Sequence, residues 1–222
     1  MKAIQDIKSL VVELMGSNPY EGFEPAGYRL DITGWQSQHP LFEQIIAAVR
    51  PRRILELGTW KGASAIHMAQ IARRFDAQAQ VLCVDTWLGS HRVLWMTPDY
   101  RKELVLKNGF PQQYFQFLAN VALSGLQEVI FPLPMTSYCA TDILGLSGIL
   151  FDVIYIDAHH DEDEVMRDVR RCYDLLRVGG IMFGDDYSPA EPGVIKAVNG
   201  FAAERGLYLS TQQEKWAFQK PP

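Results

Sequence analysis

Short apolar runs and helical patterns alternate along this chain from about residue 53 to residue 205. The apolar runs predict strands near residues 54–57, 81–85, 129–131, 151–157 and 181–183, and amphipathic stretches between them predict helices. Continuous apolar runs of this kind are typical of strands that are buried on both faces. The alternation implies a parallel sheet with helices on both faces, so we expect an α/β fold. Two later runs, near 208–209 and 216–218, predict a terminal hairpin.

The first 50 residues differ from the rest, and we expect them to form an N-terminal helix and lid segment. Residues 1–15 place apolar side chains on one helical face, which predicts a helix packed on the core or, alternatively, a lid or a dimer contact. Residues 16–40 form a loop rich in Gly and Pro with recurring aromatic residues, which often cover a pocket. Residues 51–222 should form the main domain, with an inserted lid segment at about 87–110.

Composition and charge argue against several classes of protein. The chain of 222 residues has a formal net charge of -5 and no basic block, so nucleic-acid binding has no electrostatic support. Asp6 and Glu13 interrupt the apolar residues of the N-terminus, which argues against a signal peptide or a membrane span. The three cysteines have neither a metal-type nor a CxxC spacing, so a reduced, cytoplasmic protein is the simplest interpretation.

A glycine turn follows the first predicted strand. The segment ILELGTWKGAS, residues 54–64, is typical of a strand, a tight turn and the start of a helix. Gly58 can adopt a backbone geometry closed to other residues, and Gly62 allows a ligand to approach the chain closely. The loop and the helix N-terminus then offer free N–H groups to a polar ligand. Glu56, just before the loop, suits a cationic or hydroxyl-rich ligand better than a pyrophosphate.

Polar residues stand at the ends of the predicted strands. Because ligands of parallel sheets bind beyond the carboxyl ends of the strands, these residues should converge on one edge of the sheet. Asp85 ends the second strand, where a carboxylate can accept hydrogen bonds from ribose hydroxyls, although it could also be a turn or helix N-cap residue. The other strand ends carry Gly58, Thr136, Ser137, Asp157, Asp185 and Asp186.

Three aspartates, Asp157, Asp185 and Asp186, follow two strands that we expect to be neighbours. With no Lys or Arg near them in the sequence, they would repel one another unless protonated or bound to a cation such as Mg²⁺, Ca²⁺ or Mn²⁺. The alternative is that Asp185 and Asp186 are turn residues. His160, which follows His159, could accept a proton, contact the substrate or ligate a metal; ligation would shift the ion toward a transition metal.

These motifs resemble those of class I S-adenosylmethionine-dependent methyltransferases. ILELGTWKGAS (54–64) is similar to their motif I, and VDTW (84–87) is similar to their ribose motif. YIDAHH (155–160), LRVGG (176–180) and GDDY (184–187) resemble one branch. That branch includes metal-dependent macrocin-type sugar O-methyltransferases, the cephalosporin-hydroxylase-like group and, more distantly, catechol-type O-methyltransferases. The likeness covers about residues 40–205 and implies a Rossmann-like, seven-stranded, mostly parallel sheet whose last strand is antiparallel.

The resemblance also implies roles for individual residues. Asp157, Asp185 and Asp186 match the metal-binding carboxylates, and His160 stands where the branch commonly has histidine and where catechol-type enzymes carry a catalytic lysine. The glycine loop would contact the methionine part of the cofactor, Asp85 the ribose, and the end of the third strand the adenine. The cofactor-binding set is then Glu56, Gly58, Trp60, Gly62, Ser64, Asp85, Thr86, Thr136, Ser137 and Asp157.

We therefore expect methyl transfer from S-adenosylmethionine to a hydroxyl of a small molecule such as a sugar, glycoside or phenol, assisted by a divalent cation, Mg²⁺ in the first instance. His160 or Asp157 would take the proton. One alternative is a nicotinamide-dependent oxidoreductase, although G-x-G-x-x-G is missing; the other is a methyltransferase-like subunit without chemistry. Nucleic acid and membrane are not expected partners, and a homo-oligomer is compatible with the sequence. Candidates for the acceptor wall are Trp35, His39, Trp87, His91 and Trp95.

Overall fold

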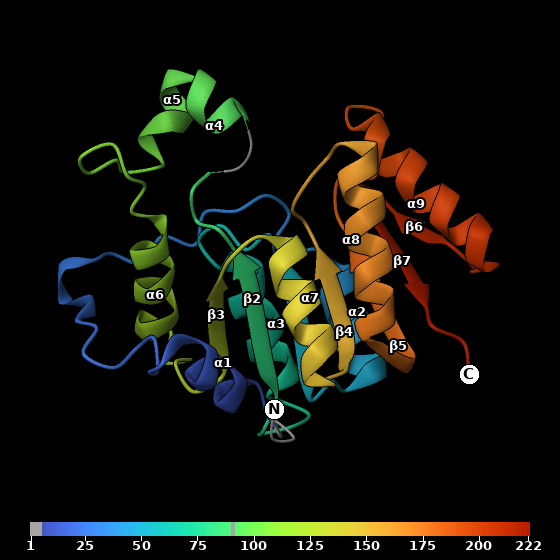
Figure 1. The fold of residues 1–222 in the computed structure, drawn as a ribbon, viewed down its shortest axis with the longest axis horizontal. Coiled ribbons are helices and arrows are strands. Elements are labelled where there is room, and N and C mark those ends of the chain that lie inside the picture. The colour runs from blue at the N-terminus through green and yellow to red at the C-terminus, as the bar shows by residue number, and fades with distance from the viewer. Residues whose placement is uncertain (1–5, 90–91) are drawn as a thin grey trace.

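A computed structural model describes residues 6–89 and 92–222 of the chain (Figure 1). In these residues, seven strands form one sheet in the order β3-β2-β1-β4-β5-β7-β6. Neighbours among the first five strands pair in parallel, and β7 runs antiparallel to both β5 and β6. The predicted α/β fold with an antiparallel last strand is confirmed. The strands are β1 (Arg53–Leu57), β2 (Gln80–Asp85), β3 (Ile130–Pro134), β4 (Phe151–Ile156), β5 (Leu176–Gly184), β6 (Ser210–Gln212) and β7 (Lys215–Gln219).

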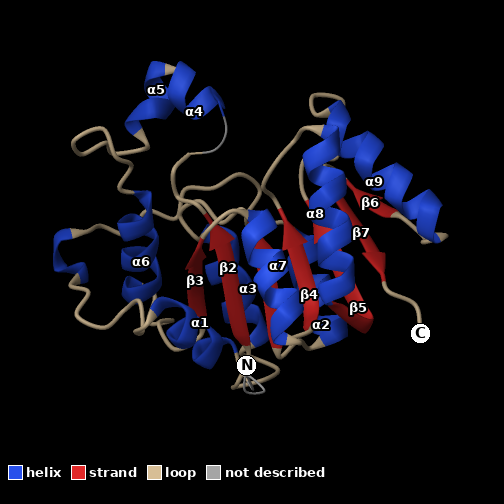
Figure 2. Cartoon of the chain, in the orientation of Figure 1, coloured by secondary structure: helices blue, strands red, loops and turns tan. Residues whose placement is uncertain are grey.

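Helices cover both faces of the sheet (Figure 2), with α7 and α8 in front of the strands and α2 and α3 behind them in this view. A 3₁₀ turn at Pro25–Gly27 lies within the loop that follows the first helix. The helices are α1 (Ile7–Met15), α2 (Pro40–Val49), α3 (Ala63–Ala72), α4 (Arg92–Met96), α5 (Pro98–Lys102), α6 (Gln113–Leu123), α7 (Ser137–Ser147), α8 (Glu162–Leu175) and α9 (Pro192–Arg205). None of these described helices is long and apolar enough to cross a membrane.

The strands bury side chains on both faces because successive residues point to opposite sides. Leu55 and Leu57 belong to a core with α1, α7, α8 and α9, whereas Ile54 belongs to a second core with α2, α3 and α6. Three fully buried residues of α1, Ile7, Leu10 and Val11, lie in the first core. The N-terminal helix therefore packs on the core, which is the first of the alternatives that its pattern allowed.

Two sequence-based boundaries need correction. The strand predicted near 181–183 begins earlier, at Leu176, because α8 ends at Leu175 and Gly179 and Gly180 lie within β5. Their backbone groups pair with Lys220: the Gly179 N–H donates to the Lys220 carbonyl, and the Lys220 N–H donates to the Gly180 carbonyl, both at 2.9 Å. The strand predicted near 208–209 begins at Ser210, two residues later than expected.

Strand β3 forms one edge of the sheet, which is where strands that contain proline are found. Pro132 and Pro134 lie within the strand, and each lacks a backbone N–H. The carbonyl of Ile130 accepts a hydrogen bond from the Tyr20 hydroxyl at 2.9 Å, so the N-terminal loop covers the start of this edge.

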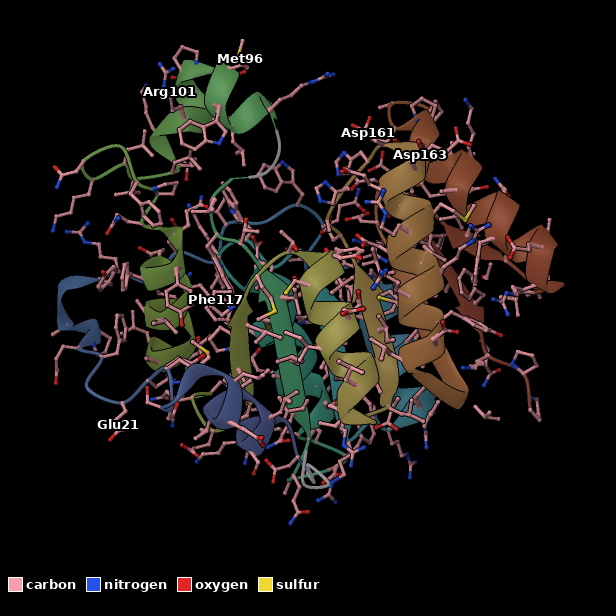
Figure 3. All side chains as sticks on the ribbon, in the orientation of Figure 1. Glu21, Met96, Arg101, Phe117, Asp161 and Asp163 are labelled. Carbon is pink, nitrogen blue, oxygen red and sulfur yellow. The ribbon has the colours of Figure 1, made fainter. Side chains whose placement is uncertain are left out.

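The parallel strands end at one edge of the sheet, and two flanking segments rise beside that edge. Helices α4 and α5 project beyond β2 and β3 (Figure 1). Met96 and Arg101 lie on this insertion, while Asp161 and Asp163 lie at the start of α8, on the opposite side (Figure 3). The strand ends therefore lie between two raised segments, where the sequence predicted a site.

A close approach between β1 and β4 depends on Gly58. Its φ is +79°, and an added Cβ would lie 1.9 Å from the Asp157 carbonyl oxygen. Gly16 has nearly the same φ, +80°, but nothing lies within 4 Å of an added Cβ. Substitution at Gly16 should therefore report the cost of the left-handed backbone alone, whereas substitution at Gly58 adds a backbone clash.

We predict that Gly16→Ala lowers the free energy of unfolding by about 1–2 kcal/mol. Gly58→Ala should lower it by roughly 1–3 kcal/mol more, because a buried clash is added to the strain. Urea unfolding followed by circular dichroism measures both. Equal losses in the two variants would show that the approach to Asp157 does not constrain the fold.

Candidate active site

A cavity of about 530 Å³ opens at the carboxyl ends of the strands. Its inner part is lined by residues at the ends of β1 to β5, and its outer part by two walls, one from the N-terminal loop and one from the insertion that contains α4 and α5. The N-terminal wall consists of Thr33, Gly34, Trp35 and Ser37, and the insertion wall of Gly89, Val93, Leu94 and Tyr100. Of the predicted cofactor residues, those that line the cavity are Gly58, Trp60, Ser64, Asp85, Thr86, Thr136, Ser137 and Asp157.

Glu56 lies beneath the glycine loop and does not line this cavity. Its fully buried carboxylate accepts hydrogen bonds from the hydroxyls of Thr59 at 2.8 Å and Ser64 at 2.5 Å. Burial raises the pKa of Glu56 to about 7, although both hydroxyls favour the charged form. The expectation that Glu56 faces the ligand needs correction, because the side chain joins the two ends of the loop.

Gly62 also lies behind the cavity wall. It precedes α3 with a φ of +86°, and an added Cβ would lie 2.9 Å from the Phe117 ring. Packing against α6 and the backbone conformation therefore explain why position 62 requires glycine.

Asp85 lines the cavity and also holds the glycine loop. Its Oδ2 accepts hydrogen bonds from the backbone N–H groups of Thr59 and Trp60, both at 2.9 Å, and its Oδ1 accepts one from Trp87 N–H at 2.8 Å. Asp85 is therefore also a turn residue, which is the alternative that the sequence left open. A carboxylate has about four acceptor positions, so a further hydroxyl can still bind at Asp85.

The end of β3 contributes Thr136 and Ser137 at the start of α7. Thr136 is the N-cap residue, and its hydroxyl accepts a hydrogen bond from the Cys139 N–H at 3.2 Å. Both residues line the cavity, as expected for the end of a parallel strand.

Asp157, His160 and Asp186 form a compact group in the lining of the same cavity. Each offers one possible ligand atom, and these atoms lie within 4.8 Å of one another. His160 Nε2 lies 3.0 Å from Asp186 Oδ2, and its Nδ1 lies 3.3 Å from Glu191 Oε2. The hydrogen bond with Asp186 is the main reason that the pKa of His160 rises to about 9. Burial and then the charges of Asp185 and Asp186 raise the pKa of Asp157 to about 8.

Asp185 lies beside this group but has a partner that the sequence analysis missed. Lys215, whose side chain is fully buried, forms an ion pair with Asp185 Oδ2 and donates to the Tyr155 hydroxyl at 2.9 Å. The Tyr155 hydroxyl in turn lies 3.1 Å from Asp157 Oδ2. The expected mutual repulsion of three carboxylates is thus relieved by a lysine from β7. His160 takes the place of Asp185 in the three-residue group.

The predicted acceptor residues have divergent positions. Trp35 lines the cavity, is 61% exposed and stacks obliquely on Trp60 with ring centroids 5.9 Å apart. His39 lies outside the cavity because it caps α2, with Nδ1 accepting from the Leu41 N–H at 3.2 Å. Trp87 is buried against α6 and donates to the Trp60 carbonyl at 2.8 Å. The predictions that His39 and Trp87 line the acceptor wall therefore need correction. His91 lies outside the described residues.

Trp95 also lies outside the cavity wall. Its indole N–H donates to the Gly89 carbonyl at 2.7 Å, so it braces the insertion. His159, in contrast, lines the cavity and pairs through Nδ1 with Glu164 Oε2 at 2.9 Å.

The strand order, the glycine loop and the carboxylates at the strand ends define a class I methyltransferase fold. The chain matches the family model described as a methyltransferase domain over residues 55–187, and it belongs to that family. The predictions of this class and of a methyltransferase enzyme are confirmed, whereas the macrocin-type branch stays a prediction. Membership of this family removes the nicotinamide-dependent oxidoreductase from the alternatives.

Known proteins similar to this chain extend the comparison. The O-methyltransferase from Bacillus cereus in complex with SAH has a TM-score of 0.60 and 16% identity, with coverage of 99% of this chain and 94% of that one. The O-methyltransferase NovP has a TM-score of 0.64 and 21% identity, with coverage of 84% and 80%. An uncharacterized protein of Sinorhizobium fredii, y4gI, is 31% identical over 161 residues, which are 72% of this chain but 16% of that protein. The two solved structures thus support the fold.

The buried carboxylate of Glu56 predicts a specific dependence of stability on pH. Its pKa in the folded protein, about 7, lies above the ordinary value of 4.5, so folding favours the protonated form. This contribution is fully present below about pH 4.5 and is lost as the pH rises through about 7. Relative to Glu56→Gln, the wild-type protein should lose about 2–3 kcal/mol of unfolding free energy between about pH 5 and about pH 8.

Urea unfolding at the two pH values measures this difference. Glu21→Gln is the control, because Glu21 is exposed on the N-terminal loop (Figure 3) and should show no such divergence. Parallel pH profiles for wild type and Glu56→Gln would mean that Glu56 is ionised at little cost.

The ion pair between Lys215 and Asp185 makes a second prediction. Lys215→Met leaves a buried carboxylate without its partner and should cost about 3–5 kcal/mol of unfolding free energy. Lys102→Met, which removes the exposed pair with Asp99, should cost about 1 kcal/mol or less. Adding Asp185→Asn to Lys215→Met should restore part of the loss, since the uncompensated charge is removed. If the double variant is as unstable as Lys215→Met alone, the loss of unfolding free energy comes from packing and not from the unpaired charge.

Proposed function

We propose that the chain catalyses the transfer of a methyl group from S-adenosylmethionine to a hydroxyl oxygen of a small molecule, with a divalent cation at Asp157, His160 and Asp186. One observation carries the proposal: a single cavity is lined both by the glycine loop and Asp85 and by these three residues. A cofactor and an activated acceptor could therefore meet within it.

The residues present fit the cofactor. Asp85 retains acceptor capacity for a ribose hydroxyl, and Thr136 and Ser137 offer polar groups for an adenine. The glycine loop supplies the wall between them through Gly58 and Trp60. Similarity to an O-methyltransferase whose structure contains SAH supports this choice of cofactor. S-adenosylmethionine, when bound, supplies the methyl group as an electrophile.

The residues present also fit a divalent cation. Two carboxylates and an imidazole provide a mixed oxygen and nitrogen set, which suits Mg²⁺ or a first-row transition ion such as Mn²⁺. Among the described residues, no donor reaches the buried Oδ1 of Asp185, so an acceptor atom beside the group is unsatisfied. A bound cation supplies Lewis acidity that lowers the pKa of a hydroxyl group.

The protein residues would orient the acceptor and receive its proton. His160 is held between Asp186 and Glu191, so its ring orientation is fixed before the acceptor enters. The charge of Asp186 keeps a proton on His160 up to about pH 9. A cation bound at Asp157 and Asp186 would lower that pKa, so that the neutral ring could become the third ligand. The lone pair of His160 would then be used by the cation, so the proton of the acceptor would go to Asp157, whose carboxylate has a second oxygen.

The cavity also restricts the acceptor. Its described lining residues include five carboxylates, Asp85, Asp157, Asp185, Asp186 and Glu191, and neither Lys nor Arg. An acceptor with a carboxylate or phosphate would find no lysine or arginine there to pair with, and it would face the five carboxylates. Trp35 on the N-terminal wall and Tyr100 on the insertion wall offer aromatic faces, which suit a sugar ring or a planar phenol. We therefore favour an acceptor without negative charge.

Calorimetric titration tests the cofactor. S-adenosylmethionine should bind with a dissociation constant of about 1 μM to 1 mM, and NAD should not bind. An acceptor screen of glycosides and catechols, with and without Mg²⁺, Mn²⁺ and chelator, should then yield a methylated product only with the cation. Activity that persists in chelator would remove the metal from the proposal, and absence of cofactor binding would remove the proposal itself.

A matched pair of variants localises the metal role. Asp157→Ala should abolish metal-stimulated turnover and leave cofactor binding largely intact. Asp161→Ala is the control, because Asp161 is exposed on the same loop and its side chain makes no helix-capping hydrogen bond. Equal turnover in both variants would contradict the role of Asp157.

A further inference from the structure

Lys61 lies in the glycine loop between Trp60 and Gly62, but its side chain points away from the cavity wall. It is only 3% exposed. Its ammonium lies 2.6 Å from Asp31 Oδ2 and 2.6 Å from Glu103 Oε2. Burial alone would lower the pKa of Lys61, but the hydrogen bonds with these two carboxylates raise it. The lysine is therefore a charged link with two partners.

The two partners belong to different walls of the cavity. Asp31 precedes Thr33, Gly34 and Trp35 of the N-terminal wall. Glu103 is the C-cap residue of α5, in the insertion that contains the wall residues Val93, Leu94 and Tyr100. One side chain of the cofactor loop thus holds both outer walls of the cavity.

Helix α6 completes this link with uncharged hydrogen bonds. The amide of Asn120, a fully buried residue, donates to the backbone carbonyls of Asp31 at 2.6 Å and Lys61 at 2.8 Å, and it accepts from the Asp31 N–H at 2.9 Å. Gln113 Nε2 donates to the Glu103 carbonyl at 3.1 Å. These hydrogen bonds hold the backbone next to each partner, and the ammonium of Lys61 adds the contact that joins the loop to both side chains.

We propose that Lys61 is a positioning residue that couples the cofactor loop to the two outer walls of the cavity. A ligand that further restrains the loop also restrains the N-terminal wall and the insertion wall, so cofactor binding prepares the acceptor side of the cavity. This inference rests on the proposed function in one respect: the proposed function identifies the ligand of the loop as S-adenosylmethionine. The two carboxylates are partly exposed, so the link can open and close while the core stays folded.

Hydrogen exchange followed by mass spectrometry tests the link on the full chain. Lys61→Met keeps most of the side-chain volume and removes the charge. It should speed exchange by about tenfold in both 29–37 and 92–104, because both walls lose their partner. Asp31→Asn should affect only 29–37, and Glu103→Gln only 92–104. Lys102→Met, which breaks an exposed pair beside Glu103, is the control and should affect neither.

Addition of S-adenosylhomocysteine tests the coupling. In the wild type it should slow exchange in the loop and in both walls, whereas in Lys61→Met it should slow exchange in the loop alone. Protection of both walls in Lys61→Met would overturn the proposal, as would faster exchange spread evenly over the core strands. If calorimetry shows that the ligand does not bind the wild type, the proposed function fails. The segment-specific pattern of the ligand-free variants still decides whether Lys61 links the walls.

Discussion

Two carboxylates from neighbouring strands hold the glycine loop, and the cavity depends on this arrangement. Glu56, below the loop, accepts from the hydroxyls of Thr59 and Ser64, while Asp85, beside it, accepts from two backbone N–H groups of the loop. The loop is thus fixed from two directions before any ligand arrives. This preorganisation reduces the conformational entropy that cofactor binding would otherwise have to offset.

The carboxylates that follow β4 and β5 are held together in a different way. Buried like charges at Asp157 and Asp185 would be costly, and Lys215 reduces that cost through its ion pair with Asp185. Tyr155 joins the lysine to Asp157 through hydrogen bonds. The carboxylates are therefore held near one another by the protein itself, and a cation would bind to a group that is already assembled.

The sequence predicted the sheet well because strand and helix periodicities are local signals. It also predicted that polar residues converge at the strand ends, since that follows from parallel topology alone. It did not find Lys215, because this lysine reaches the site through antiparallel pairing of β7 with β5. The registered pair of Gly184 and Trp216 places Lys215 beside Asp185, one step further along the ladder. The signal in the sequence was that Lys215 directly precedes the apolar run near 216–218.

Aromatic and histidine side chains were the least predictable part of the site. Trp87 and His39 were assigned to the acceptor wall from their residue type and their position in loops, yet one packs on α6 and the other caps a helix. Such roles depend on how a side chain is oriented in three dimensions, which one-dimensional patterns do not encode. Glu56 does lie in the first strand, just before the loop, as the sequence predicted. That its side chain is buried beneath the loop could not be inferred from this position.

The proline-containing edge strand limits how copies of this chain can associate. Another strand that added to β3 would need backbone donors, but Pro132 and Pro134 have none and the Ile130 carbonyl is already bound by Tyr20. β-Augmentation through this edge is therefore disfavoured, as is the edge-to-edge stacking that leads to aggregates. A symmetric dimer that used this side of the sheet would have to form through helices or loops, so its interface would be built from side chains.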